Sequence, residues 1–136
     1  MSEQENTRIV QQAYETFKNG DVAGLLDMYS NDIDWHLPTV EELPWFGSRK
    51  GRDNTAEFFQ RLAEAQDSVS FNPKKFIAQG DDVVAMGDYT WRSNATGKEF
   101  GGEWAHAWTV RDGKLASFRE YADTAAASSA HRKDAA

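Results

Sequence analysis

The stretch that decides the fold is FGGEWAHAWTVRDGKLASFREYAD, residues 100–123. In its first half, around Trp104, His106 and Trp108, the side chains alternate with the period of two that is typical of a β-strand. The residues Arg-Asp-Gly-Lys at 111–114 are a strong signal for a tight turn, and the remainder again has strand character. We therefore expect a β-hairpin in this stretch.

Working outward from the hairpin, the earlier part of the chain shows helical periodicity bounded by capping signals. Ser2 and Glu5 have the spacing of a capping box, and Gly20 can end the first helix. Asp21 and Asp53 can cap the two helices that follow. In chain order, the expected elements are helices within 2–20, 22–29 and 53–66 and strands over 33–37, 69–78, 83–93, 100–110 and 115–123.

Two segments fall outside these elements. Residues 39–52 are expected to form a long loop, and the adjacent aromatic residues Trp45 and Phe46 indicate that this loop packs against the rest of the molecule. The Ala- and Ser-rich tail, residues 125–136, is expected to be flexible beyond an ordered core of about residues 5–124. Pro73 indicates a bulge or an edge position in its strand.

The order of elements defines the fold class. Helix, helix, strand, loop, helix and then four strands is an α+β arrangement, and 136 residues are the length of one domain, 1–136. A sheet with such long strands twists and bends. We expect a cone-shaped, curved, mixed or antiparallel sheet with three helices over its concave face.

Composition excludes several classes of partner. The formal net charge of -7 is opposite in sign to what nucleic acid or an anionic membrane surface would attract. The chain has no cysteine, and its histidines share no metal-ligand spacing with carboxylates, so we expect neither metal nor cofactor. We also expect no signal peptide, no membrane segment and a cytoplasmic location. Five tryptophans in a chain of this length indicate a ligand-facing wall.

The order and spacing of several short motifs resemble the nuclear-transport-factor-2-like superfamily, which has a cystatin-like cone, and within it the SnoaL-like polyketide cyclase and ketosteroid-isomerase-like group. The resemblance covers about residues 9–123. It implies a pocket inside the cone for a small hydrophobic ligand, and a homodimer formed through the outer sheet face. The motifs are Lys18-Asn19-Gly20-Asp21, 32–38, 47–51 with Phe58-Phe59, Thr96-Gly97-Lys98, Glu103-Trp104-Ala105-His106 and 111–114.

The resemblance argues against ketosteroid isomerase activity. The position of that group's general base falls at Leu37, that of its oxyanion-hole tyrosine at Ala13, and that of its protonated acid at His106. Enolisation in that group requires a carboxylate base and two neutral acid donors. Leu37 and Ala13 cannot supply these groups.

The cyclases of the group provide a closer match. They use a histidine on the penultimate strand, which corresponds to His106, and a histidine and an aspartate on the last strand, which correspond to Phe118 and Glu120. A glutamine two residues before the first histidine corresponds to Trp104. Half of the polar set is therefore present, and the substitutions make the expected pocket drier.

The hairpin register decides whether His106 and Glu120 share a face. If the turn is a bulged three-residue loop, Val110 pairs with Lys114, His106 lies opposite Phe118, and Glu120 is diagonal to His106 on the same face. If the turn has two residues, Val110 pairs with Leu115 instead. Glu120 then moves to the opposite face and Arg119 takes its place.

Three functions follow from these residues. The first is a small-molecule enzyme of the SnoaL-like type, a cofactor-free isomerase, cyclase or hydrolase of an apolar, carbonyl-bearing or polycyclic substrate, with His106 and Glu120 as catalytic proton carriers. The second is a non-catalytic binding or sensing domain, and the third is a dimeric scaffold with a filled pocket. The expected substrate-binding wall consists of Tyr14, Phe17, Trp35, Leu37, Trp45, Phe46, Phe59, Leu62, Trp104, Trp108 and Phe118.

Each polar candidate also has a purely structural interpretation. His106 can be a buried histidine with satisfied hydrogen bonds, and Glu120 can form an ion pair with a nearby arginine or lysine on a solvated face. Asp123 can cap the tail. His36 is expected at the surface, and His131 is expected in the frayed tail.

Overall fold

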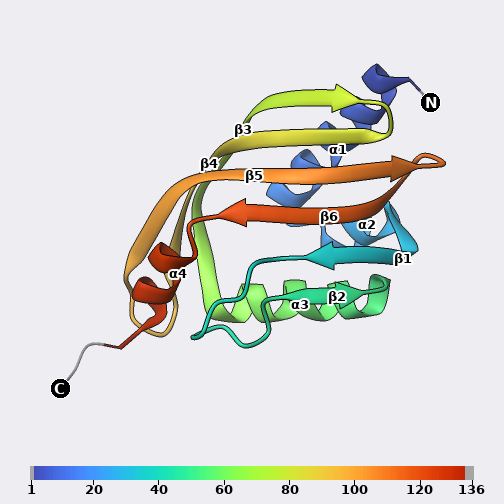
Figure 1. Cartoon of the computed structure of the whole chain (residues 1–136). Helices are drawn as coiled ribbons and strands as arrows, with labels where there is room; N and C mark the ends of the chain where they lie inside the picture. Colours follow the sequence, from blue (N-terminus) through green and yellow to red (C-terminus); the bar gives the residue numbers. More distant parts are fainter. Residues whose placement is uncertain (1, 134–136) are drawn as a thin grey trace.

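The computed structural model describes residues 2–133 and contains a six-stranded sheet and four helices (Figure 1). The helices are α1 (Glu3–Lys18), α2 (Val22–Asp27), α3 (Arg52–Ala65) and α4 (Thr124–His131). The strands are β1 (Tyr29–His36), β2 (Ser48–Lys50), β3 (Gln66–Gln79), β4 (Asp82–Ser93), β5 (Glu99–Arg111) and β6 (Lys114–Ala122).

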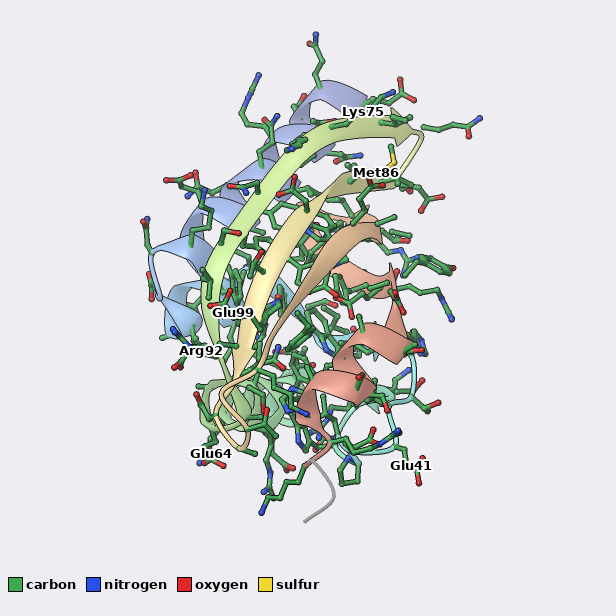
Figure 2. All side chains as sticks on the ribbon, turned by 90° about the vertical axis from the view of Figure 1, so that its left-hand side faces the viewer. Glu41, Glu64, Lys75, Met86, Arg92 and Glu99 are labelled. Carbon is green, nitrogen blue, oxygen red and sulfur yellow. The ribbon has the colours of Figure 1, made fainter. Side chains whose placement is uncertain are left out.

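The sheet is open and mixed, with the strand order β2-β1-β6-β5-β4-β3. Only the β1–β6 pair is parallel among the paired strands of residues 2–133. Helices α1, α2 and α3 lie together on one side of the sheet (Figure 1), and the long strands β3, β4 and β5 bend along their length (Figure 2). The expected α+β class, with a curved sheet and helices packed over one face, is confirmed.

The first two helices begin where the capping signals predict, and the first also ends there, whereas α2 ends at Asp27 because Tyr29 already begins β1. The Ser2 hydroxyl accepts a hydrogen bond from the backbone N–H of Glu5 at 3.1 Å, and the Asp21 side chain accepts one from Gly24 N–H at 2.9 Å. Gly20 has a φ of +75°, the left-handed conformation that ends a helix without steric cost to glycine. Tyr14 is thereby placed on the buried face of α1.

The segment expected to be a long loop contains the short strand β2. It pairs with β1 through Asp34–Lys50, Trp35–Arg49 and His36–Ser48. A three-residue strand is too short for a hydrophobic period to reveal it. Asp53 lies in the first turn of α3 and not at the cap, because the cap is Gly51, which supplies no side-chain hydrogen bond.

The expectation of a frayed tail is wrong for residues 124–131, which form α4. Asp123 caps this helix by accepting a hydrogen bond from Ala126 N–H at 3.2 Å. Ala127, Ala130 and His131 are buried, and α4 lies beside the bent ends of β4 and β5 (Figure 1). Tertiary contacts stabilise this short Ala-rich helix, whose sequence alone has little amphipathic character. Residues 134–136 of the expected tail lie outside the described residues.

The β5–β6 register combines features of both predicted alternatives. The turn has two residues, Asp112 (φ 53°) and Gly113 (φ 76°), as in a type I′ hairpin, so Val110 pairs with Leu115. The pairing then shifts by one residue, because Ala116 is an extra residue in β6. This bulge reverses the change of face that a two-residue turn would otherwise impose.

The hydrophobic core lies between the sheet and helices α1–α3. It is unusually rich in aromatic rings; Trp35, for example, is stacked on Phe118 with ring centroids 4.0 Å apart. A smaller cluster of Val40, Leu43 and Ala127 joins α4 to the loop after β1. Among residues 2–133, no helix is both long and apolar enough to cross a membrane.

Candidate functional site

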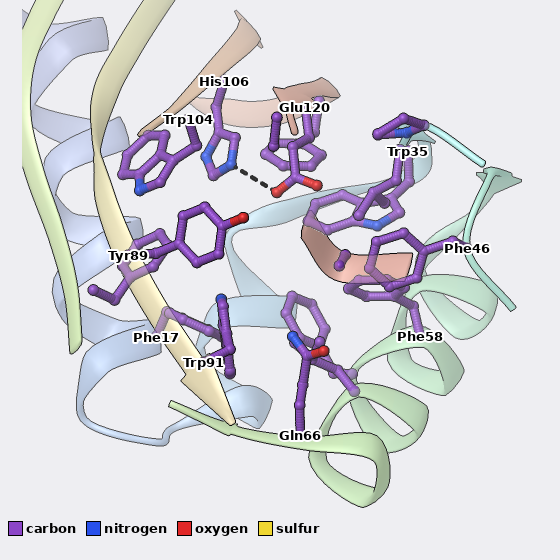
Figure 3. A pocket seen from close by; sticks show the side chains of 18 of the residues that line it. Phe17, Trp35, Phe46, Phe58, Gln66, Tyr89, Trp91, Trp104, His106 and Glu120 are labelled. Atoms are coloured by element: carbon purple, nitrogen blue, oxygen red, sulfur yellow. Dashed lines mark hydrogen bonds and ion pairs between the residues drawn. The ribbon is translucent and has the colours of Figure 1, made fainter. Parts of the chain in front are cut away.

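His106 and Glu120 form the polar centre of the candidate site. They lie directly opposite each other in the β5–β6 ladder, whereas the three-residue-turn alternative predicts Phe118 opposite His106 and Glu120 diagonal to it. His106 Nε2 is 3.2 Å from Glu120 Oε1 (Figure 3), and the exposed fractions of the two side chains are 6% and 22%. A carboxylate and an imidazole therefore share one partly dry environment, and the alternative with Arg119 in place of Glu120 is excluded.

Tyr14 connects this pair to the helical layer. Its hydroxyl oxygen is 2.7 Å from Nδ1 of His106, and it accepts a hydrogen bond from Nε1–H of Trp108 at 2.8 Å. Because an indole can only donate, the Tyr14 hydroxyl proton needs another acceptor, and Nδ1 of His106 is the one within hydrogen-bond distance among residues 2–133. His106 then carries its proton on Nε2 and donates it to Glu120. Burial raises the pKa of Tyr14 far above its ordinary value, which keeps its hydroxyl protonated.

Aromatic neighbours hold the imidazole ring in place. The Trp104 ring is stacked on His106 at a centroid distance of 4.1 Å, and Phe118 meets it edge-on at 4.7 Å. Together with hydrogen bonds at both ring nitrogens, these contacts fix the tautomer and the orientation of His106. The arrangement is suited to a positioned proton donor and acceptor.

A cavity of about 110 Å³ opens beside His106 and Glu120. For comparison, an engineered apolar cavity of about 150 Å³ accommodates a benzene molecule. Every residue of the expected wall except Trp45 lines this cavity. The cone is therefore not filled by its own side chains, and its wall is apolar except for a few polar groups.

Trp45 is the one predicted wall residue that the structure places elsewhere. It packs edge-on against Phe46 at a centroid distance of 4.7 Å and against Phe58 at 5.5 Å. Its backbone carbonyl accepts a hydrogen bond from the Arg49 guanidinium. Neighbouring residues of a loop can point in different directions, and here Phe46 faces the cavity while Trp45 covers the loop.

The comparisons with known proteins agree with this fold. The SnoaL-like domain family matches residues 10–118. This chain belongs to the SnoaL-like domain family. No curated protein sequence matches the chain significantly.

Solved structures place this SnoaL-like domain among nuclear-transport-factor-2-like folds. It is 36% identical to an NTF2-like protein from Burkholderia xenovorans LB400, with a TM-score of 0.87 over 97% of this chain and 99% of that one. It is 25% identical to TerC, co-crystallised with polyporic acid, with a TM-score of 0.78 over 93% and 98% of the two chains. A candidate polyketide cyclase from Xanthomonas campestris pv. campestris, at 19% identity and TM-score 0.78 over 96% and 98%, shares the fold.

Two positions discussed for ketosteroid isomerase are apolar wall in this SnoaL-like domain. Leu37 and Ala13 both line the cavity. The neighbouring Tyr14 does provide a neutral hydroxyl, but that hydroxyl is engaged by His106 and Trp108.

The sequence analysis missed several cavity residues. Tyr89 and Trp91 on β4 project into the SnoaL-like cavity, with the Tyr89 hydroxyl directed towards the His106–Glu120 pair (Figure 3). The period-two pattern of this strand could have identified them, since they share a face with the buried Val83 and Ala85. Gln66 also lines the cavity, but it was expected to end a helix, and no local signal places it at the start of β3.

Two further polar side chains belong to the wall of the SnoaL-like site. Within residues 2–133, the buried Trp35 Nε1–H, which belongs to a wall residue, has no hydrogen-bond partner. Asp123, at the end of β6, lines the cavity in addition to capping α4. No group of three or more His, Asp or Glu side chains in the described part of the chain is placed to hold a metal ion.

Proposed function

We propose that this SnoaL-like domain is a small-molecule enzyme, a cofactor-free isomerase, cyclase or hydrolase that acts on an apolar, carbonyl-bearing substrate. The observation that carries the proposal is the hydrogen-bonded row Trp108–Tyr14–His106–Glu120, which ends at the wall of an aromatic cavity. A pure scaffold would not need a carboxylate at a partly dry cavity wall, where an unpaired charge is costly. Members of the same fold named as cyclases are consistent with this proposal.

Glu120 is the base in this mechanism. One of its oxygens accepts a hydrogen bond from His106 Nε2–H, so the second oxygen is left for the substrate. The carboxylate takes a proton from the carbon next to the substrate carbonyl, and the electron pair of that C–H bond moves towards the carbonyl oxygen. In an isomerisation, the same proton returns to a different carbon, so the reaction balances without a redox partner.

His106 and Tyr14 have supporting roles. His106 orients the carboxylate through its Nε2–H. Once Glu120 has taken the substrate proton, Nε2–H can donate a hydrogen bond to the enolate oxygen, and the proton on Glu120 is the one that passes to another carbon or to a leaving group. Tyr14 fixes the tautomer that makes this possible, because its own proton occupies the hydrogen bond to Nδ1.

A binding or sensing domain without turnover is the second candidate function. It is favoured by the dominance of aromatic rings in the cavity wall and by the engagement of both nitrogens of His106 within the protein. The two functions share the ligand site but differ in one measurable property. Only the enzyme converts the ligand into a product or exchanges one of its protons with solvent.

The decisive experiment follows proton exchange and turnover with a panel of polycyclic ketones in D₂O by NMR. Glu120→Gln should lower the rate by about 100-fold or more, and His106→Ala should lower it by a similar factor. Glu103→Gln and His36→Ala are the matched controls. Glu103 is exposed on the same strand, His36 is half-buried on β1, and neither lines the cavity.

Binding of the same ketones, measured by tryptophan fluorescence, separates the possible outcomes. Binding with neither exchange nor turnover in the wild-type protein would favour the sensing domain. Exchange that survives unchanged in both Glu120→Gln and His106→Ala would show that the proposed proton carriers are wrong.

A further inference from the structure

The charges at the cavity wall all have one sign. Among the described residues, the carboxylates of Glu120 and Asp123 line the cavity, and no lysine or arginine does. The remaining wall is aromatic or aliphatic except for Gln66, Thr124 and His106. A ligand that enters this cavity therefore meets negative charge that no cation of the wall offsets.

Neither carboxylate is paired with a lysine or arginine among the described residues. Glu120 is hydrogen-bonded to Nε2 of His106, the ring whose Nδ1 lies 2.7 Å from the Tyr14 hydroxyl. Asp123 accepts a hydrogen bond from Ala126 N–H at the start of α4. In the ion pairs of residues 2–133, no lysine or arginine contacts either carboxylate.

The two carboxylates act on a common point in the cavity. Burial raises the pKa of Tyr89, and the charges of Glu120 and Asp123 raise it further. The Tyr89 side chain reaches into the cavity, with its hydroxyl towards Glu120 (Figure 3). Both negative charges are therefore felt where a ligand would lie.

The aromatic wall adds to the same preference. The faces of tryptophan, tyrosine and phenylalanine rings carry negative electrostatic potential, which attracts cations and repels anions. The overall charge of -7 gives the surrounding field the same sign. The carboxylates, the aromatic rings and the net charge thus all disfavour a negatively charged ligand.

We infer that the cavity selects against anions and takes uncharged or singly protonated amine ligands with an apolar ring body, which present a hydroxyl or ammonium donor to Glu120 and Asp123. This inference rests on the proposed function only in that the cavity holds a small molecule. It narrows the substrate class to neutral or amine-bearing carbonyl compounds and excludes free carboxylic acids.

The test is calorimetric titration with three ligands that share one ring system: naphthylmethanol, naphthylmethylamine and naphthoate, all substituted at the same ring position. At neutral pH they are uncharged, positive and negative, respectively. We expect naphthoate to bind at least about tenfold more weakly than the alcohol, as Coulomb repulsion in a partly dry site implies. The amine should bind at least as tightly as the alcohol.

Two charge-neutralising variants locate the effect. Glu120→Gln and Asp123→Asn should each reduce the preference for the alcohol over naphthoate, and asparagine retains the helix cap at residue 123. Glu103→Gln, on the exposed side of β5, should leave that preference unchanged. Retention of the cap can be checked from the unfolding transition of Asp123→Asn.

The outcomes separate this inference from the proposed function. Equal or tighter binding of naphthoate, or a preference that neither variant alters, overturns the charge selectivity while leaving a ligand-binding cavity in place. If none of the three ligands binds, both the proposed function and the charge selectivity are wrong.

Discussion

The Tyr14 hydroxyl lies 2.7 Å from Nδ1 of His106, although the two residues are 92 positions apart in the chain. Helix α1 brings the hydroxyl to the sheet, and Trp108 donates to the same oxygen. This contact fixes the ring orientation and the tautomer with which His106 donates a hydrogen bond to Glu120. A residue that no sequence comparison placed in a polar role thus organises the candidate site.

Tyr14→Phe should destabilise the protein by about 1–3 kcal/mol, because it leaves the buried Trp108 N–H and His106 Nδ1 without partners. Urea unfolding measures the change. The matched control is Tyr89→Phe, whose hydroxyl forms no hydrogen bond among residues 2–133 and whose loss should change the free energy of unfolding by less than about 0.5 kcal/mol. Equal effects of the two substitutions would contradict the role assigned to Tyr14.

His131 should make the docking of α4 sensitive to acid. Its Nε2 is 2.8 Å from Gln66 Oε1, and its Nδ1 is 3.0 Å from the Ser93 hydroxyl. Burial lowers the pKa of His131 below its ordinary value of 6.5, and the charge of Glu42 opposes this only in part. The unfolded chain therefore binds this proton at higher pH than the folded chain does.

The sign of the pH effect follows from that difference. The contribution of neutral His131 to the free energy of unfolding is complete above the ordinary pKa of 6.5. It falls as the pH drops below that value and levels off once His131 of the folded chain is also protonated. Urea unfolding at about pH 7.5 and about pH 5.5 should show this loss in the wild type. The loss of stability should be smaller in His131→Gln, whose side chain at residue 131 does not titrate. An identical loss in both proteins would assign it to other groups.

Gly87 should not tolerate a side chain. A Cβ at this position would lie 2.1 Å from the backbone oxygen of Asn72 and 2.7 Å from the Trp104 ring. Gly87→Ala should therefore cost about 1–3 kcal/mol or more through overpacking, measured by urea unfolding. Gly20→Ala is the comparison, since a Cβ there meets open space and the cost is only about 1 kcal/mol from its left-handed backbone. A smaller effect at residue 87 than at residue 20 would be inconsistent with this packing.

We propose that a second copy of the chain packs on the outer face of the sheet. The ladder register aligns Ile77 with Val84 and Ala107 in one row on the face opposite His106, and Tyr121 lies in the next row. Ile77 and Tyr121 are 49% and 58% exposed, unusual for such large apolar side chains.

Light scattering coupled to size-exclusion chromatography tests this proposal. The wild type should have the mass of a dimer, and Tyr121→Arg should shift the mass to that of a monomer. Gln11→Arg, exposed on α1, should remain dimeric. A wild-type protein that stays monomeric at high concentration would rule out the dimer.

Much of the fold could be predicted because it is encoded locally. The capping residues Ser2 and Asp21 fix the starts of the first two helices, and period-two alternation marks the long strands. Most residues of the expected wall line the cavity for the same reason, since residues that alternate onto one face of a strand share its environment. The strand β2 and the helix α4 were missed because both are short, and tertiary contacts stabilise them.

The sequence alone determined an α+β chain with a negative net charge, an aromatic-rich core and a candidate histidine and carboxylate on adjacent strands. Only the tertiary structure decided that these two side chains meet. The two-residue turn of Asp112 and Gly113 would by itself have placed Glu120 on the outer face, and the bulge at Ala116 returns it to the cavity. A β-bulge depends on how one strand fits between its neighbours, which is a property of the assembled sheet, and so no local pattern could reveal it.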